Sequence, residues 1–216
     1  DSDIRDFIAN ISHEMKAPLN GIIGFTDLLQ ETQLSIEQTE YVEALRTSSE
    51  FLLEIVNDIL DISRLEAGKV EIEEIRFDIR YSLELIYDAT AKLARDKNIG
   101  IHTVCDPSIP PLLKGDPTRI RQILTNLLTN AVKFTDQGDV MLSVLMEEEI
   151  DTEVFLKFSV KDTGIGIPDK HQKKIFESFT QMDTTVPRKY GGTGLGLSIA
   201  NRLVKLLGGV LELKSI

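Results

Sequence analysis

Residues 42–75 read VEALRTSSEFLLEIVNDILDISRLEAGKVEIEEI, and the spacing of their apolar side chains changes near Gly68. Before this glycine, small or apolar residues recur at alternating steps of three and four, as in a helix of a bundle, at Val42, Leu45, Ser49, Leu52, Val56, Ile59 and Ser63. After it, the apolar residues follow the shorter spacing of a strand, at Val70, Ile72 and Ile75. Gly68 suits the position that follows a helix C-terminus. We therefore predict a helical unit over residues 1–68 and a second unit over 69–216.

The residues before this stretch predict a partner helix with the same heptad spacing, at Ile4, Ile8, Ile11, Met15, Pro18, Ile22, Phe25 and Leu29. A polar gap over 30–38 separates the two helices, and Ser35 with Gln38 has the spacing of a capping box. Each helix has a wide apolar face that a single hairpin cannot cover. We expect a homodimer that closes a four-helix bundle. The alternative is that the hairpin packs against the second half of its own chain.

The residues after Gly68 alternate between strand-like and helix-like patterns. Strands are predicted at 70–75, 99–103, 140–145, 154–160 and 209–214, and helices at 78–97, 118–134 and 195–207. This order predicts an α/β sandwich in which helices cover one mixed sheet. The chain as a whole is therefore expected to be α+β, with a helical hairpin followed by the sandwich.

Composition excludes several classes of function. The 216 residues carry 35 acidic against 24 basic side chains, a net charge of −11, so nucleic acid is not an expected partner. The single cysteine allows neither an internal disulfide nor a cysteine-based zinc site. No apolar run approaches the ~20 residues that cross a bilayer, and the acidic start lacks a secretory signal. We expect a cytoplasmic fragment without membrane contact, whose parent chain is free to carry a membrane anchor.

His13 is the first candidate for chemistry. On the heptad it falls at position f, away from the seam, where a lone histidine is usually only solvated. Two neighbours make it more informative: Glu14 puts a carboxylate beside it, and Pro18 stands inside the helix, where proline costs ~3 kcal/mol.

Residues 11–21, ISHEMKAPLNG, resemble the H-box of sensor histidine kinases. The resemblance implies that His13 accepts the γ-phosphoryl group of ATP and that Glu14 accepts the ring proton. The nucleophile is a neutral imidazole, which a histidine of ordinary pKa, about 6.5, supplies at physiological pH. Ala17 departs from the family, which usually has Thr or Asn there to orient water during dephosphorylation of a partner. We expect weak phosphatase activity for that reason.

Residues 126–133, NLLTNAVK, place Asn126, Asn130 and Lys133 on one polar stripe of an otherwise apolar helix. An amide oxygen can bind Mg²⁺, and a lysine can bind phosphate. Taken alone, such a block is more often a surface stripe than a binding site. It resembles the N-box of the same family, which implies that Asn130 holds the metal while Asn126 and Lys133 support the phosphates.

Residues 162–166, DTGIG, follow a predicted strand. A carboxylate at a strand end can accept hydrogen bonds from the amino group of adenine, and glycines let the backbone approach the base. The block resembles the G1 box, which implies that Asp162 reads adenine beside Gly164 and Gly166. Residues 175–179, IFESF, resemble the F-box, although their phenylalanines could also be ordinary core.

The glycine-rich block RKYGGTGLGL, residues 188–197, opens directly onto a predicted helix whose N-terminus favours phosphate. It resembles the G2 box and the end of the ATP lid. The nucleotide-binding residues implied here are Arg188, Lys189, Gly192, Thr193, Gly194, Leu195, Gly196 and Leu197. Family members continue for about one strand pair after Gly209, so the C-terminal strands are expected to be truncated.

Together the resemblances to the sensor histidine kinases imply ATP- and Mg²⁺-dependent autophosphorylation of His13, with onward transfer to an aspartate of a response-regulator receiver domain. Two alternatives stay open. A clamp ATPase of the gyrase type would hydrolyse ATP, but such enzymes normally place a glutamate base where Asn126 stands. A signalling module would bind nucleotide and dimerise without phosphoryl transfer.

Overall fold

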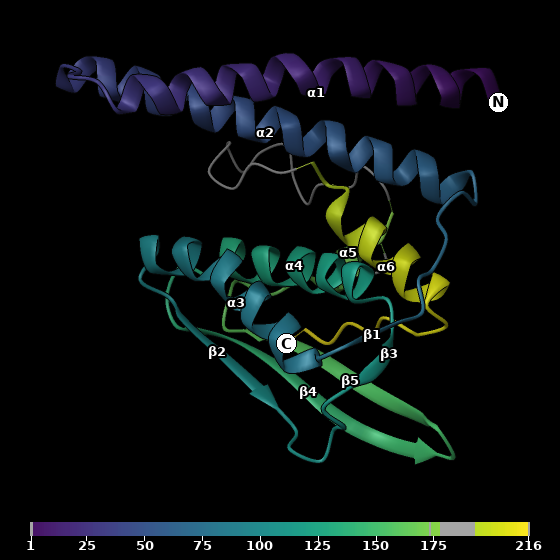
Figure 1. Cartoon of the computed structure of the whole chain (residues 1–216). Helices are drawn as coiled ribbons and strands as arrows, with labels where there is room; N and C mark the ends of the chain where they lie inside the picture. The colour runs from purple at the N-terminus through teal and green to yellow at the C-terminus, as the bar shows by residue number, and fades with distance from the viewer. Residues whose placement is uncertain (1, 173, 178–192, 216) are drawn as a thin grey trace. The chain divides into compact units, whose positions relative to one another are not determined.

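The computed structural model describes residues 2–172, 174–177 and 193–215, and of residues 2–10, 12 and 13 it describes the backbone alone (Figure 1). These residues form two compact units. The first contains the chain up to Glu71 together with the short segment 193–195. The second begins at Ile72 and takes in the other described residues. No helix of the described residues is long and apolar enough to cross a membrane.

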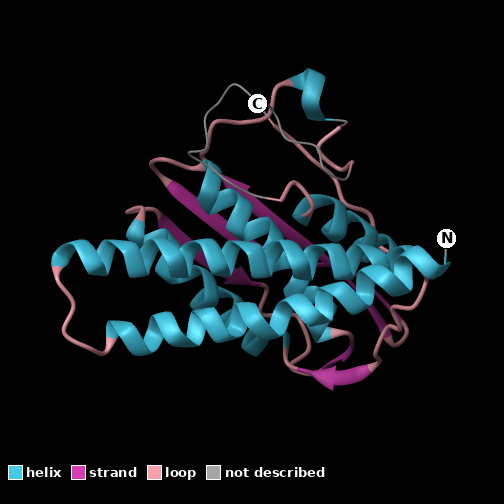
Figure 2. Ribbon diagram, turned by 90° about the horizontal axis from the view of Figure 1, so that it is seen from above, coloured by secondary structure: helices cyan, strands magenta, loops and turns pink. Residues whose placement is uncertain are grey.

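The first unit is built on an antiparallel pair of long helices, α1 (Ser2–Gln30) and α2 (Ile36–Glu66), seen side by side in Figure 2. The predicted capping box is present, because the Gln38 amide donates to Ser35 Oγ (3.2 Å) and the Ser35 amide donates to Gln38 Oε1 (2.9 Å). Gly68 has a φ of +61°, as expected after a helix C-terminus. Helix α1 continues through Pro18. The helical hairpin is therefore confirmed.

The seam of this hairpin is only partly covered. Among its seam positions, Val42 and Val56 are buried, as are the neighbouring Leu19 and Leu60. Other predicted seam positions keep much of their apolar surface in solvent, with exposed fractions of 70% for Phe25, 55% for Leu45, 43% for Ile22 and 39% for Leu52. One hairpin therefore leaves these four heptad positions exposed.

The second unit contains β1 (Ile75–Phe77), α3 (Ile79–Asp96), β2 (Gly100–Cys105), β3 (Leu113–Gly115), α4 (Pro117–Phe134), β4 (Asp139–Ile150), β5 (Glu153–Asp162), α5 (Asp169–Gln172) and α6 (Gly196–Leu206). Its main sheet has the order β2-β4-β5, with β2 parallel and β5 antiparallel to β4. β1 and β3 pair in a separate antiparallel ribbon. The helices α3, α4 and α6 lie over one face of the main sheet (Figure 1). The predicted mixed sheet with helical cover is confirmed.

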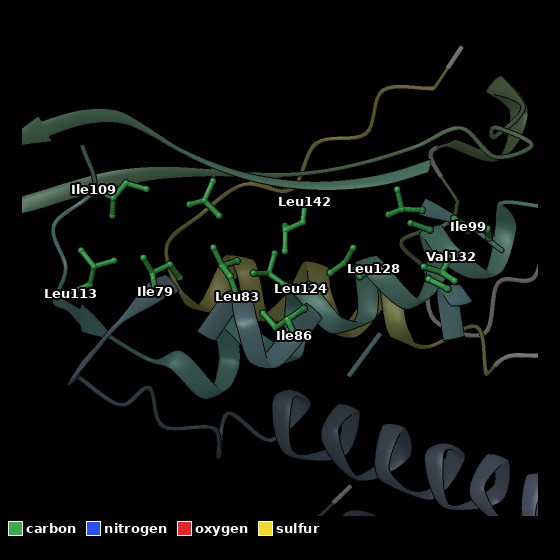
Figure 3. Packing of buried hydrophobic residues seen from close by; sticks show 14 residues of the cluster. Ile79, Leu83, Ile86, Ile99, Ile109, Leu113, Leu124, Leu128, Val132 and Leu142 are labelled. Atoms are coloured by element: carbon green, nitrogen blue, oxygen red, sulfur yellow. The ribbon is translucent and has the colours of Figure 1, made fainter. Parts of the chain in front are cut away.

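The core lies between these helices and the sheet. Figure 3 shows Leu83 and Ile86 of α3 and Leu124 and Leu128 of α4 gathered below Leu142 of β4. Each of these five side chains is at most 2% exposed. Because the apolar residues of α4 recur on one face, burying that face fixes which residues of α4 point away from the core.

Some predicted elements differ in the structure. Residues 209–214 alternate like a strand but have no regular secondary structure, and 70–74 likewise stay outside β1. A strand is stable only when a neighbour completes its hydrogen-bond ladder, which the pattern of one segment does not supply. β3 and α5 were not predicted, because three or four residues carry no readable period.

Asp116 fixes the start of α4. Its side chain is 2% exposed, and its carboxylate accepts from the amides of Arg119 (2.9 Å) and Glu73 (3.1 Å). One residue therefore caps α4 and holds the segment at the start of the second unit, just before β1. Asp78 caps α3 with a single bond from the Arg80 amide (2.8 Å) and is exposed.

Replacing Asp116 with Ala should lower the free energy of unfolding by about 2–3 kcal/mol, since a cap is lost and a second amide loses its partner. Asp78→Ala should lose about 1 kcal/mol or less, because water can reach its partner amide. Urea unfolding of both variants checks the difference. Equal losses would show that the bond to Glu73 contributes nothing.

Candidate active site

The polar stripe of α4 faces the beginning of α6. Asn126, Asn130 and Lys133 are half-buried on the helix side opposite its core residues. Asn126 Nδ2 donates to the carbonyl of Gly196, the first residue of α6, at 3.2 Å. A Cβ added to Gly196 would lie 3.8 Å from both Asn126 Cγ and Asn130 Nδ2. The structure therefore brings both predicted asparagines and the N-terminus of α6 together.

Lys133 lies one turn beyond Asn130, near the C-terminus of α4. Its ammonium stands 5.2 Å from the centroid of the Phe134 ring, within the range of a cation–π contact. Lys133 and Asn130 therefore both lie in the C-terminal part of α4, as expected for residues of one polar stripe.

The DTGIG loop rests on that end of α4. Asp162 is the last residue of β5, and its Oδ1 accepts from the Gly164 amide at 2.8 Å. The Ile165 amide donates to the carbonyl of Phe134, the last residue of α4, at 3.3 Å. Gly166 has a φ of +68°, which favours glycine. The predicted adenine-reading loop and the predicted phosphate stripe are thus joined through the C-terminus of one helix.

Gly164 has no room for a side chain. A Cβ there would lie 2.5 Å from the Phe134 carbonyl oxygen and 2.7 Å from Asp162 Oδ1. These distances are shorter than real Cβ contacts, so only glycine allows the loop to sit this close to α4.

Thr163 also supports the loop, which the sequence did not indicate. Its hydroxyl accepts from the Asp139 amide at 3.1 Å and lies 3.3 Å from the Gln137 carbonyl, to which it can donate. Thr163 therefore ties the loop to the turn that precedes β4. A threonine in a glycine-rich loop has no sequence signal that would identify this task.

The described end of the glycine-rich block, residues 193–195, belongs to the first unit. The Thr193 hydroxyl accepts from the Leu195 amide (3.0 Å) and donates to Asp58 Oδ2 of α2 (2.7 Å). Gly194 has a φ of +70°, and Leu195 is buried. Arg188, Lys189 and Gly192 lie outside the described residues.

Asp58 was not a predicted site residue, because one carboxylate on a charged helix gives no signal. Burial raises the pKa of its carboxyl to about 6; the hydroxyl of Thr193 opposes this rise, and the charges of Glu54 and Asp61 add to it. The group therefore changes charge in the range just below neutral pH.

The free energy of unfolding should fall as the pH rises through about 4 to 6. In that window the folded chain still holds a proton on Asp58 that the unfolded chain has released, because the folded pKa is the higher one. We expect a loss of about 1 kcal/mol, since the side chain is partly open to solvent. Asp58→Asn should remove this loss, whereas Asp88→Asn, at an exposed position of α3, should retain it. Urea unfolding at pH 5 and 7.5 measures both. An unchanged pH dependence in Asp58→Asn would contradict the assignment.

The predicted phosphoacceptor lies in the other helix of the hairpin. His13 and Glu14 both belong to α1, five and four residues before Pro18. Glu14 is exposed, and the structure describes the backbone alone for His13. Of the F-box residues, Ile175 is buried and Phe176 is half-buried, as core residues would be, while Phe179 lies outside the described residues.

Two family models match the chain, one over each unit. The His Kinase A (phospho-acceptor) domain matches residues 3–68. The Histidine kinase-, DNA gyrase B-, and HSP90-like ATPase matches residues 115–216. The chain belongs to the sensor histidine kinases. It is a catalytic core of that family, and the ATPase family model lies over its second unit.

Curated histidine kinases resemble this core over nearly its whole length. Hybrid signal transduction histidine kinase B of Dictyostelium discoideum is 41% identical over 97% of the chain, which spans 11% of that protein. Sensor protein GacS of Pseudomonas syringae pv. syringae is 41% identical, and BarA of Escherichia coli K12 is 40% identical. Each of these two matches covers 97% of the chain and 23% of the relative. The histidine kinase core therefore spans less than a quarter of the length of these relatives.

Two solved structures share the fold. Full-length ShkA, in complex with AMPPNP, matches with a TM-score of 0.74 and 39% identity, over 94% of this chain and 41% of that one. The histidine kinase AdeS of Acinetobacter baumannii matches with a TM-score of 0.61 over 94% of this chain and 91% of that one. At 19% identity, AdeS supports the fold alone.

Within this histidine kinase core, the second unit brings together the residues predicted for adenine, metal and phosphate. Asn126, Asn130 and Gly196 meet at the side of α4, while Asp162 and Gly164 meet its C-terminal end. The predicted residues His13, Glu14, Thr193, Gly194 and Leu195 belong to the first unit. The sequence did not predict the hydrogen bond from the Asn126 side chain to Gly196, which connects α4 with α6.

Proposed function

We propose that this histidine kinase core transfers the γ-phosphoryl group of ATP to a ring nitrogen of His13. The observation that carries the proposal is the meeting of three predicted elements at α4, namely its asparagine stripe, the DTGIG loop and the N-terminus of α6. A phosphoacceptor family model over the hairpin supports the other half of the reaction. The complex of ShkA with AMPPNP supports an adenine nucleotide as the ligand.

The second unit has the groups that a nucleotide needs. The Asp162 carboxylate at the end of β5 accepts the amino hydrogens of adenine, while Gly164 and Gly166 keep the backbone close to the base. Lys133 and the amides at the start of α6 attract the phosphates. By resemblance to the G2 box, the phosphates would also be bound by residues of the glycine-rich block, namely Arg188, Lys189, Gly192, Thr193, Gly194, Leu195, Gly196 and Leu197.

The donor set fits Mg²⁺ through Asn130. The described residues contain no cluster of three or more histidine, cysteine or acidic side chains that could hold a metal by themselves. An amide oxygen on α4 suits a cation that takes oxygen donors and completes its shell with phosphate and water. Bound Mg²⁺ would neutralise charge on the phosphates. Asn126, whose Nδ2 is bonded to Gly196, holds the N-terminus of α6 beside the Asn130 side chain.

In the proposed transfer, His13 accepts the phosphoryl group and Glu14 accepts the proton that His13 loses. The lone pair of a neutral ring nitrogen forms the N–P bond as the bond between the γ-phosphorus and its bridging oxygen breaks, and ADP leaves. The proton on the other ring nitrogen passes to Glu14. The protein contributes mainly position and charge.

The exposed seam positions of the hairpin support a homodimer. A second copy would cover Ile22, Phe25, Leu45 and Leu52 and close a four-helix bundle. By the chemistry of the family, the phosphoryl group then passes to an aspartate of a response-regulator receiver domain. The Ala17 side chain has no polar atom to orient water, so dephosphorylation of the partner receiver domain should be slow.

Incubation of the purified chain with Mg²⁺ and γ-labelled ATP tests the proposal. We expect a phosphoprotein whose label is released by acid and retained in base, as an N–P bond requires. Steady release of phosphate from an unlabelled chain would instead favour a clamp-type ATPase. Nucleotide binding with neither labelling nor release would favour a non-catalytic signalling module.

A further inference from the structure

The last carbonyl groups of α4 accept hydrogen bonds from three different segments of the chain. A helix leaves its last four carbonyl groups without partners inside the helix. In α4, the Thr135 hydroxyl donates to the carbonyl of Ala131 (2.7 Å). The Lys97 ammonium donates to the carbonyls of Val132 (2.9 Å) and Lys133 (2.6 Å). The Ile165 amide donates to the carbonyl of Phe134 (3.3 Å). The carbonyl of Thr135, the residue after the helix, also accepts from Lys97 Nζ (3.0 Å).

Lys97 is therefore an unusual lysine. It is the C-cap residue of α3, and its side chain crosses to α4 instead of extending into water. An ammonium group has three hydrogens to donate, and here three carbonyls accept them. Its positive charge also stands at the negative end of the α4 dipole.

Lys97 bonds to the carbonyls before and after that of Phe134, which is the carbonyl that the DTGIG loop contacts. Lys97 holds the carbonyls of Lys133 and Thr135, the residues on either side of Phe134. Phe134 O itself accepts from Ile165, and Gly164 lies too close to this oxygen for any side chain. A small rotation of the Phe134 peptide would therefore move the loop.

We infer that Lys97 is a positioning residue for nucleotide binding. By fixing the end of α4, it holds the Asp162 carboxylate at a set distance from Asn130 and Lys133, so that adenine and phosphates are bound at once. The inference rests on the proposed nucleotide site. Lys97 itself would touch no ligand and would act through the backbone of α4.

The test compares Lys97→Met with Lys97→Arg and with Lys92→Met, a matched loss of charge at an exposed position of α3. Calorimetry with Mg²⁺ and ADP gives the affinity, and hydrogen exchange of the nucleotide-free protein gives the protection of each amide. In Lys97→Met we expect about tenfold weaker ADP binding and about tenfold faster exchange of the Ile165 amide. Amides of β4 should exchange as in the unchanged chain. Lys97→Arg should recover part of both losses, and Lys92→Met should show neither.

Three results would overturn the inference in distinguishable ways. Unchanged ADP affinity in Lys97→Met, with normal binding by the unchanged chain, would remove the role of Lys97 and leave the proposed function standing. Equal acceleration of exchange at Ile165 and throughout β4 would show a merely structural lysine. Failure of the unchanged chain to bind ADP would overturn the nucleotide site itself.

Discussion

Replacement of His13 with Gln should abolish labelling by γ-labelled ATP, with a reduction of at least about a hundredfold. An amide nitrogen has no lone pair comparable to that of an imidazole, so no N–P bond forms. Glutamine favours helices, and the change should leave α1 intact. Because Asn130 and Asp162, which we propose to bind the nucleotide, belong to the second unit, ADP affinity should stay unchanged. Labelling measures the first effect and calorimetry the second.

The chain supplies its own controls, since it has only three histidines. His102 lies on β2 with a 3.1 Å contact to Asp139, and His171 lies in the short helix α5. His102→Gln and His171→Gln should both be labelled normally. Full labelling of His13→Gln, or its loss in either other variant, would place the acceptor elsewhere.

Replacement of Gly164 with Ala should weaken ADP binding by about 30- to 100-fold, which corresponds to about 2–3 kcal/mol. The new methyl group would meet the Phe134 carbonyl oxygen at 2.5 Å and Asp162 Oδ1 at 2.7 Å. Either the loop leaves the end of α4, or the Asp162 carboxylate rotates and loses its bond from the Gly164 amide. Both responses displace the group proposed to bind adenine. Calorimetry of the variant against the unchanged chain measures the effect.

Gly115→Ala is the matched control within the second unit. Its added methyl group would stand 3.5 Å from Phe77 Cε1, an ordinary contact distance. We expect ADP affinity close to that of the unchanged chain. Equal affinities for both variants would show that the loop accommodates a side chain, and that its approach to α4 does not matter for binding.

Much of the fold was predictable from short-range patterns. The heptad spacing, the Ser35 capping box and Gly68 predicted the hairpin, because helix periodicity and caps depend on residues a few positions apart. The alternation over 209–214 was misleading for the opposite reason, since a strand needs a distant partner. The same holds for strands as short as β3.

In the candidate site, too, features set by nearby residues were predictable and contacts between distant residues were not. Asn126, Asn130 and Lys133 share a face by helix geometry alone, so their grouping could be predicted. The bonds of Lys97 to α4 and of Asp58 to Thr193 could not, because both join residues 35 or more positions apart. In the sequence, Lys97 is only one charged residue among several at the end of α3.

The parallel pairing of β2 with β4 limits the order in which parts of the second unit can fold during synthesis. Gly100 of β2 stands opposite Asp139 of β4, and the whole of α4 lies between them in the chain. Among the described residues, β2 has no other ladder partner. While a ribosome is still making α4, β2 therefore has no strand with which to form its ladder hydrogen bonds. The two helices of the hairpin, which are close in sequence, can already pack together at that stage.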